Sequence, residues 1–390
     1  MNTVCRLCGS ENTSREYRLC SDMRIMGETF RGGDCYISRC SDCGFVFNTY
    51  SDAEQASFTG YYRSENSKTV NYYDVYPKEQ VDAYLQHLAE LVGKCAGDKG
   101  RSARILDIAG GYGEVSLYLK KSGYDKVTMT EIKENCISAV REKGIEVLEC
   151  DMLEKNLSEV FDIVICSHDL EHMVDVSDAM CSAAALLAED GRMILELPYA
   201  PMYKEMENTP YHFFTYEHVC HFSDITVRNM ASLSGTEIVD YGHYVKCSDY
   251  PCVWALLKRK KENHVMIEKD DSLWNDINDY RVACDEQMKR KLEAFIRDQR
   301  PLILWGIGAS TAQLMNGAFN GCNVVQLIDK NEARQGNIFE INGKKLTVMP
   351  PETIKNPSAT IFILPSAYRN SIERDIRNLG FQNKVMCLED

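Results

Sequence analysis

The 390-residue sequence predicts an α/β protein made of three consecutive units. Two C-x2-C pairs near the N-terminus indicate a small metal-binding unit, and a strand, a glycine-rich turn and a helix follow one another after residue 104 and again after residue 301. Alternating strands and helices of this kind form mostly parallel sheets covered by helices. We therefore place the units at residues 1–75, 76–260 and 261–390, a division that the chain length supports.

The composition limits what the protein binds. Hydrophobic residues make up 44% of the chain and charged residues 26%, which is typical of a folded soluble protein. The formal net charge of −14 argues against bulk binding of nucleic acid, which needs a basic surface. No apolar run approaches the roughly 18 residues that cross a bilayer, and no signal-peptide pattern is visible. We expect a cytoplasmic monomer or homodimer that binds neither nucleic acid nor membrane.

The two C-x2-C pairs predict a structural zinc site. The expected ligands are Cys5, Cys8, Cys40 and Cys43. Each pair places two thiolates on one tight turn, and two such turns supply the four-sulfur shell that structural Zn²⁺ prefers, with no open position for catalysis. Cys20 and Cys35 lie between the pairs and remain competing ligands, and chance pairing of cytosolic cysteines remains the alternative.

The middle unit begins with "ARILDIAGGYGEVSLYLKKSG". An apolar strand (Ile105, Leu106) ends in Asp107, a turn with three glycines follows, and a helix starts near Glu114. Glycines let the backbone approach a ligand and adopt positive φ. The carboxyl ends of parallel strands are where open α/β sheets bind ligands, so we expect a ligand at this turn.

Two further acids follow the next strands in the same way. Glu131 comes at the end of the strand Val127–Met129, before a helix over residues 133–143, and a third strand is predicted to end at Asp151. Fourth and fifth strands are expected in "FDIVICSHDLEHM" and "GRMILELPYA". Three acids on one sheet edge favour a nucleoside site, because a carboxylate can accept both ribose hydroxyls. Another doubly wound domain with chance acids at its strand ends is the alternative.

The turn after Asp107 resembles the first motif of class I S-adenosylmethionine (SAM)-dependent methyltransferases, E/D-x-G-x-G-x-G, with Ala109 in place of the first glycine. The resemblance implies SAM as cofactor, with Glu131 on the ribose and Asp151 on the adenine amino group. The candidate cofactor-binding residues are Asp107, Ala109, Gly110, Gly111, Gly113, Glu131, Asp151, Met152, Ser167 and His168.

The third unit repeats the strand, turn and helix pattern in "PLILWGIGASTAQLMNGAF". Gly306 and Gly308 lie in its turn, and a later strand ends at Asp329. We expect a small Rossmann-like unit whose helix N-terminus can bind an anion. A packing domain without a ligand is the alternative.

The three units together resemble the three-domain nucleotide-sugar C-methyltransferases. That family carries a motif after the fifth core strand that reads approximately Tyr-His-Glu-His, two residues, an aromatic and Ser. Here "TYEHVCHFS" matches it at Glu217 and His218, with Tyr216 in place of the first histidine, and the matching Phe222 and Ser223 follow after three residues instead of two.

This resemblance implies methylation of a nucleoside-diphosphate 4-keto-6-deoxysugar through an enolate. His218 would be the base, since imidazole titrates near neutral pH, Glu217 would orient it, and Tyr216 or His221 would donate to the oxyanion. The candidate substrate-binding residues are His172, Gly306, Gly308, Ser310 and Asp329.

The chain departs from the family pattern mainly on the substrate side. Ser167 and His168 stand where the family has paired asparagines, and "KCSDYPCVWAL" replaces a His-Gly-Gly-Ser stretch. An O-methyltransferase with His172 or His218 as base therefore stays open, as does a non-catalytic scaffold. His168 and His172 have the i, i+4 spacing of a metal-binding helix, although we favour a loop that faces the cofactor.

Overall fold

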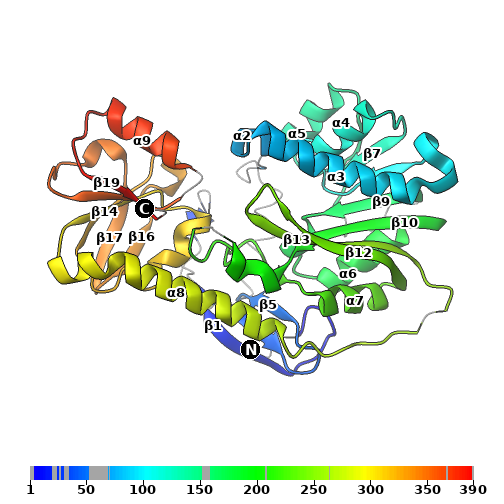
Figure 1. The fold of residues 1–390 in the computed structure, drawn as a ribbon, viewed down its shortest axis with the longest axis horizontal. Coiled ribbons are helices and arrows are strands. Elements are labelled where there is room, and N and C mark those ends of the chain that lie inside the picture. The colour runs from blue at the N-terminus through cyan, green and yellow to red at the C-terminus, as the bar shows by residue number, and fades with distance from the viewer. Residues whose placement is uncertain are drawn as a thin grey trace.

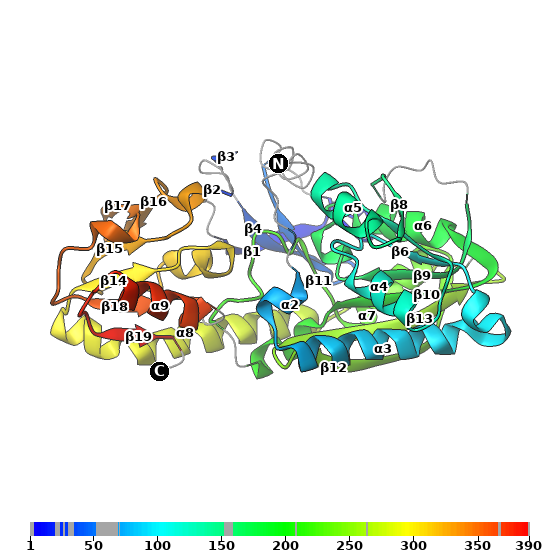
Figure 2. The ribbon, with the colours of Figure 1, turned by 90° about the horizontal axis from the view of Figure 1, so that it is seen from above.

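The computed structural model describes residues 4–19, 24–25, 28–29, 35–51, 69, 71–151, 159–206, 209–262, 264–365 and 368–388, with the backbone alone for 24–25, 28–29, 309–310 and 333. Cys20, Met152 and the side chain of Ser310 lie outside this part of the chain. Within it, no helix combines the length and apolar character needed to cross a bilayer. The described chain forms three main sheets (Figures 1 and 2).

A seven-stranded sheet forms the middle of the chain, in the order β12-β13-β10-β9-β6-β7-β8. Its strands are β6 Ile105–Asp107, β7 Val127–Thr130, β8 Glu146–Leu148, β9 Phe161–Ser167, β10 Leu187–Pro198, β12 Thr236–Lys246 and β13 Tyr250–Arg259. Only β13 runs antiparallel to its neighbours. The carboxyl ends of the parallel strands therefore share one edge, which is where ligands bind in open α/β sheets.

Helices cover both faces of this sheet (Figure 1). They are α2 Tyr72–Val75, α3 Lys78–Ala96, α4 Glu114–Lys121, α5 Glu134–Arg141, α6 Val176–Ala185 and α7 Asp224–Leu233. Successive residues of β9 pack on opposite faces, because strand side chains alternate. Ile163 and Ile165 lie in the core beneath α3 and α4, whereas Val164 and Cys166 lie in the core that holds α6 and α7.

The third predicted strand ends earlier than the sequence suggested. β8 stops at Leu148, so the prediction that it ends at Asp151 is wrong. Its neighbour β7 ends at Thr130, which pairs with Leu148, and the Cys150 N–H donates to the Leu148 carbonyl at 3.0 Å, so the chain turns there. Asp151 consequently lies in the following loop.

The N-terminal unit contains a four-stranded sheet, β1-β4-β5-β11. Its strands are β1 Thr13–Arg18, β4 Tyr36–Cys40, β5 Val46–Thr49 and β11 Cys220–His221, with a separate hairpin of β2 Arg24–Ile25 and β3 Glu28–Thr29. β11 comes from the middle of the chain and pairs antiparallel with β5. The segment singled out as a catalytic motif is thus also a strand of the N-terminal sheet.

The C-terminal unit is a six-stranded sheet in the order β16-β17-β15-β14-β18-β19, all parallel except β16. Its elements are α8 Leu273–Asp298, β14 Leu302–Trp305, β15 Val324–Ile328, β16 Ile338–Ile341, β17 Lys344–Met349, β18 Thr360–Ile363, α9 Arg369–Asn378 and β19 Val385–Cys387. The long helix α8 runs from beneath this unit to the other two (Figure 1).

Short 3₁₀ segments complete the fold: Gly97–Ser102, Leu170–His172, Ala200–Glu205, Ala309–Met315, Glu332–Arg334 and Pro351–Thr353. The segment Ala309–Met315 stands where the sequence predicted an α-helix after Gly308. Thr311 accounts for the difference in part, because its hydroxyl accepts a hydrogen bond from the Gly308 N–H and donates to the Gly306 carbonyl, which tightens the turn.

Two glycines that follow the cysteine pairs provide a test of how the N-terminal unit docks. Gly9 and Gly44 have nearly the same backbone, with φ of +75° and +77°. A Cβ at Gly9 would meet nothing within 4 Å, whereas one at Gly44 would lie 1.9 Å from the Asp270 carbonyl oxygen. The Asp270 N–H donates to the Cys43 carbonyl at 2.9 Å, so the two backbones are in contact.

We expect Gly9→Ala to lower the free energy of unfolding by about 1–2 kcal/mol, the cost of a left-handed non-glycine residue. Gly44→Ala should cost about 1–3 kcal/mol more, because the added methyl also forces the backbones apart. Urea unfolding followed by circular dichroism measures both. Equal effects of the two variants would show that the contact with Asp270 contributes nothing.

Candidate active site

The glycine-rich turn after β6 is held in shape by its own side chains. Asp107 is buried, and its Oδ2 accepts a 2.7 Å hydrogen bond from the Ser116 hydroxyl on α4. Gly111 and Gly113 adopt positive φ, and a Cβ at Gly113 would lie 3.0 Å from Val140. Ala109 has a φ of +48° and donates its N–H to the Thr130 hydroxyl. The turn therefore needs glycine where the motif has it and tolerates Ala109 at a strained position.

Glu131 lies at the end of β7, directly beside this turn. Its Oε2 accepts a 2.9 Å hydrogen bond from the Gly111 N–H, and its Oε1 accepts from the N–H groups of Ile132 and Lys133 at 2.7 and 3.0 Å. The side chain is buried, and these bonds both fix the carboxylate and satisfy its oxygens. A carboxylate has about four lone-pair sites, so Glu131 keeps capacity for a hydroxyl ligand.

The segment before α3 lies against the same turn. Lys133 Nζ donates to the Thr69 hydroxyl at 2.8 Å, and the Tyr72 N–H donates to Glu114 Oε1 at 3.1 Å. A Cβ at Gly111 would lie 3.0 Å from the Thr69 methyl. Thr69 and Tyr72 therefore pack on the predicted cofactor turn.

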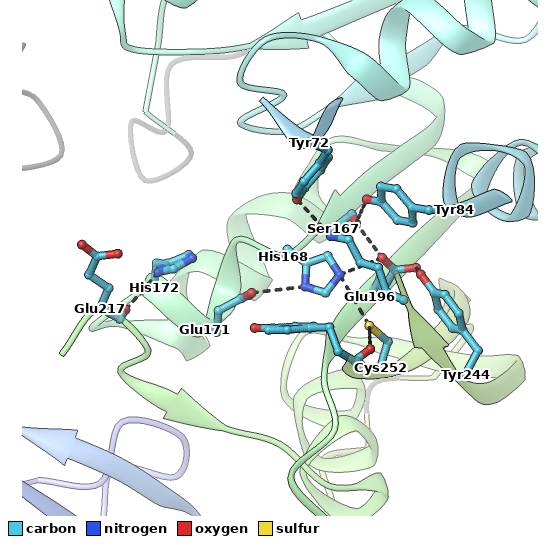
Figure 3. A network of polar contacts seen from close by, with 12 residues as sticks. Tyr72, Tyr84, Ser167, His168, Glu171, His172, Glu196, Glu217, Tyr244 and Cys252 are labelled. Atoms are coloured by element: carbon cyan, nitrogen blue, oxygen red, sulfur yellow. Dashed lines mark hydrogen bonds and ion pairs between the residues drawn. The ribbon is translucent and has the colours of Figure 1, made fainter. Parts of the chain in front are cut away.

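A buried polar network follows β9 and β10 (Figure 3). His168 lies between two carboxylates: its Nε2 is 2.9 Å from Glu196 Oε1, and its Nδ1 is 3.3 Å from Glu171 Oε1. Glu196 also accepts hydrogen bonds from the Ser167 and Tyr244 hydroxyls, at 3.0 and 2.8 Å. Glu171 and Glu196 are 1% and 0% exposed, so their charges depend on these partners.

The protonation states in this network follow from the geometry. Burial and Lys246 act to lower the pKa of His168, but contacts with Cys252 and Glu171 outweigh them and raise that pKa well above its usual value. Burial alone would raise the pKa of Glu171, yet the hydrogen bond from His168 and the nearby histidines lower it to about 2. His168 is therefore a cation held between two anions. Its φ of +60° is a strained conformation for a side chain of this size.

Lys246 at the end of β12 adds a second buried cation. Its Nζ donates to the Tyr72 hydroxyl at 2.9 Å and lies 4.1 and 4.3 Å from the ring centroids of Tyr72 and Tyr84. Cation–π attraction stabilises an ammonium ion in such a position. Lys246 thus connects the segment over the cofactor turn to the network around Glu196.

The segment 215–219 is fastened to the loop after β9. His172 Nδ1 is 2.9 Å from the Glu217 carbonyl, so this nitrogen is the donor, and the Val219 N–H donates to the Glu171 carbonyl at 2.6 Å. The rings of His172 and His218 lie 5.1 Å apart, and the ring of Tyr250 lies 6.3 Å from His218 and 5.4 Å from His168. Ser167, His168, His172 and His218 therefore gather around one site.

The other residues proposed from the motif lie elsewhere. Tyr216 is buried with its ring 4.9 Å from that of Tyr50, and His221 is fully buried on β11 against Tyr203 and Phe214. Contact of either residue with a substrate oxyanion stays a prediction. The network also contains residues that the sequence did not single out: Glu171, Glu196, Tyr244, Lys246 and Cys252.

Residues 79–241 match the family model described as a methyltransferase domain, and this range contains the cofactor turn and the buried residues Ser167, His168, Glu171 and Glu196. The match coincides with most of the doubly wound sheet. Residues 79–241 are a class I methyltransferase domain. The chain is accordingly an enzyme of the class I methyltransferase type. None of the curated proteins compared with the chain matches it.

Solved structures similar to the chain include magnesium protoporphyrin IX methyltransferase from Synechocystis PCC 6803 with bound SAH, at 16% identity and a TM-score of 0.39, covering 54% of this chain and 96% of that one. The PH0226 protein from Pyrococcus horikoshii OT3 has 19% identity and a TM-score of 0.39, covering 50% and 100%. A SAM-dependent methyltransferase from Clostridium acetobutylicum ATCC 824 has 14% identity and a TM-score of 0.36, covering 53% and 98%.

The four cysteines predicted to bind zinc lie together outside the methyltransferase domain. Cys5 Sγ is 3.6 Å from Cys43 Sγ, and Cys8 Sγ is 3.7 Å from Cys40 Sγ, with all four sulfurs within 4.8 Å of one another. Thiolates about 2.3 Å from a tetrahedral Zn²⁺ would be about 3.8 Å apart. The sulfur positions therefore fit a structural zinc ion, and Cys35 is not part of this group.

The glycines of the C-terminal turn are explained by packing within the chain. A Cβ at Gly306 would lie 2.4 Å from Pro365, and one at Gly308 would lie 2.3 Å from Arg334 Nη1. Asp329 follows β15, and its carboxylate accepts the Asn331 N–H at 2.8 Å. Arg334 donates to the Ile307 carbonyl at 3.1 Å, which places a cation beside the turn.

We expect the purified protein to contain one zinc ion per chain, and Cys40→Ser to lose it and to unfold at a lower temperature. Loss of the ion removes folding energy from a unit with little core of its own. Metal content by mass spectrometry and thermal unfolding measure the two effects. Cys181→Ser, at an exposed cysteine, is the matched control. A metal-free wild type that is as stable as the zinc-loaded protein would contradict the assignment.

Proposed function

We propose that this enzyme transfers a methyl group from SAM to a nucleotide-linked sugar, at the carbon next to a keto group. The observation that carries the proposal is the gathering of histidines from the loop after β9 and from the segment 215–221 over one methyltransferase sheet edge. A keto sugar needs a base at its α-carbon and stabilisation of the resulting enolate.

The residues at the cofactor turn fit SAM. Asp107, Glu131 and the backbone of Gly110–Gly113 would hold it, with Asp151 in the next loop. SAM carries a sulfonium and an amino group, so a buried carboxylate at the turn complements its charge, and the fixed Glu131 keeps acceptor capacity for a ribose hydroxyl. When bound, SAM supplies an electrophilic methyl group.

His218 is the proposed base. Burial and the neighbouring His172 lower the pKa of His218 well below its usual value, and Glu171 raises it, so the ring is neutral near pH 7 and able to accept a proton. The ring of Tyr250 lies beside the rings of both His168 and His218. The cations His168 and Lys246 lie near the Tyr250 ring and favour negative charge on a bound acceptor.

The nucleotide of the substrate is assigned to the C-terminal unit on the family resemblance. Asp329, Gly306, Gly308 and Ser310 are the proposed contacts there. The position of Arg334 over the turn supports an anionic ligand, because a guanidinium pairs with phosphate oxygens.

O-methylation of a sugar is the second candidate, favoured by His172. Its Nδ1–H donates to the Glu217 carbonyl, so Nε2 is the basic nitrogen of the neutral ring, as removal of a hydroxyl proton requires. The two reactions differ in the atom that loses the proton.

Incubation with labelled SAM and a panel of nucleotide 4-keto sugars should give methylated product, with exchange of the α-carbon hydrogen in D₂O. His218→Ala should abolish both while SAM affinity changes little, because the ring contacts no cofactor-turn residue in the described chain. His243→Ala, at a partly exposed histidine paired with Asp224, is the control. Transfer only to hydroxyl acceptors, without carbon exchange, would overturn C-methylation.

SAM affinity should also depend on pH through Asp107. Burial raises the pKa of Asp107 to about 7, against the lowering effect of the Ser116 hydrogen bond. The ionised form binds a cationic ligand better, so the Kd should fall by up to about tenfold between pH 6 and pH 8. Isothermal titration measures this, and Asp107→Asn should bind weakly and with little pH dependence. An unchanged slope in that variant would assign the titration to another group.

A further inference from the structure

Two buried polar atoms near the proposed base have no hydrogen-bond partner in the described chain. They are Oε2 of Glu171 and Nδ1 of His218. A carboxylate oxygen of Glu171 and one ring nitrogen each of His172 and His218 lie within 4.8 Å of one another. An unpaired buried polar group is costly, so these two atoms are expected to satisfy each other.

The Glu171 carboxylate is fixed from its other side. Its Oε1 pairs with His168, which pairs in turn with Glu196, and Ser167 and Tyr244 hold Glu196. Figure 3 shows Glu171, His168 and Glu196 in one line. Glu171 is therefore an ionised and immobile carboxylate with one free oxygen.

His218 is fixed from the backbone. Its N–H donates to the Thr215 hydroxyl at 3.2 Å, and its carbonyl accepts from Asn48 on β5 at 2.8 Å. The next residue, Val219, donates its N–H to the Glu171 carbonyl. The same short segments thus carry both the imidazole and the carboxylate, and a ligand atom of each lies within 4.8 Å of the other.

Glu217, the carboxylate adjacent in sequence, faces another group. Its charge raises the pKa of Lys133 on the cofactor side, against the larger lowering effect of burial. Figure 3 shows the Glu217 carboxylate turned away from Glu171, on the far side of His172. Glu217 is therefore poorly placed to orient His218.

We propose that Glu171, rather than Glu217, is the positioning residue for His218. The inference rests on the proposed function. Glu171 accepts the Nδ1–H of His218, which leaves Nε2 free to take a proton and stabilises the imidazolium that forms, as the carboxylate of a catalytic triad does for its histidine.

The proposed proton and methyl transfers conserve atoms and electrons. The α-carbon–hydrogen bond of the keto sugar breaks, its electron pair enters the enolate, and the proton binds Nε2 of His218. SAM, when bound, would supply the methyl group to the enolate carbon, and the electron pair of the broken methyl–sulfur bond would stay on sulfur. The imidazolium returns its proton to solvent.

A metal ion is the competing occupant, because Glu171, His172 and His218 could also ligate one. The charges disfavour it: the anions Glu171 and Glu196 are already offset by the cations His168 and Lys246. A divalent ion would add two uncompensated positive charges to a buried site.

The titratable groups near His218 come from three parts of the chain. Glu171 and His172 belong to the loop after β9, and Tyr250 belongs to β13. His212 and His221 lie within six residues of His218 in the sequence. Removing the charge of Glu171 should lower the pKa of His218. In Glu171→Gln, kcat should fall by at least about 100-fold with KM changed by less than about twofold, and the acid limb of kcat/KM should move to lower pH.

Glu171→Asp should recover part of kcat, and Glu217→Gln should leave the acid limb in place. A shift of the limb in Glu217→Gln, or none in Glu171→Gln, would overturn the proposal. A second metal ion in the wild type that Glu171→Gln loses would do the same.

Nitrogen-15 NMR of the histidine side chains in the wild-type protein tests the proposal without an acceptor or a variant. His218, assigned by its absence in His218→Ala, should show the Nδ1–H tautomer. The Nε2–H tautomer would overturn the role of Glu171. Because this measurement needs no turnover, it separates failure of this inference from failure of the proposed reaction.

Discussion

The buried pairing of Glu196, His168 and Glu171 is the interaction on which the site depends. Two carboxylates with almost no solvent exposure would each be strongly unfavourable alone, and the imidazolium between them makes both tolerable. The pairing also joins separate elements: Glu196 belongs to β10, Tyr244 to β12, Cys252 to β13, and His168 and Glu171 to the loop after β9. Removing any one partner leaves a buried charge uncompensated. Electrostatics therefore determines the chain conformation around this network as much as apolar packing does.

The N-terminal unit takes part in this arrangement through the backbone. β11 pairs with β5, and the Asn48 side chain donates to the carbonyl of His218. The position of the proposed base therefore depends on a sheet whose strands β4 and β5 are joined by the turn that carries Cys40 and Cys43. β5 starts three residues after Cys43. A zinc ion there would be structural in its coordination, because a closed four-sulfur shell has no position for a substrate. Its effect would nevertheless reach the site, since loosening β5 releases the segment that carries His218.

Local pattern was enough to predict the elements around the cofactor turn. Asp107, the glycines after it and Glu131 lie where strand and turn chemistry place them. The network was not predictable in this way, because Glu196 reads as one acid in an apolar strand and meets Ser167 only through the register of two parallel strands. The spacing of His168 and His172 left a metal-binding helix open beside the favoured loop, and the structure has a 3₁₀ turn over Leu170–His172 with His168 before it at positive φ. The two-residue strand β11 carries no periodic signal at all, so its pairing with the N-terminal sheet is information that only the fold contains.

The distribution of charge bears on the kind of acceptor the site favours. His218 is neutral, while His168 and Lys246 present fixed positive charge near the ring of Tyr250. Fixed cations beside a site stabilise negative charge that develops on an acceptor oxygen, without reorganisation during the reaction. An enolate and an alkoxide both benefit, whereas a neutral amine nucleophile gains nothing and becomes cationic on methylation. The electrostatics therefore favour carbon or oxygen acceptors that pass through an anion over nitrogen acceptors, and they do so independently of the family resemblance.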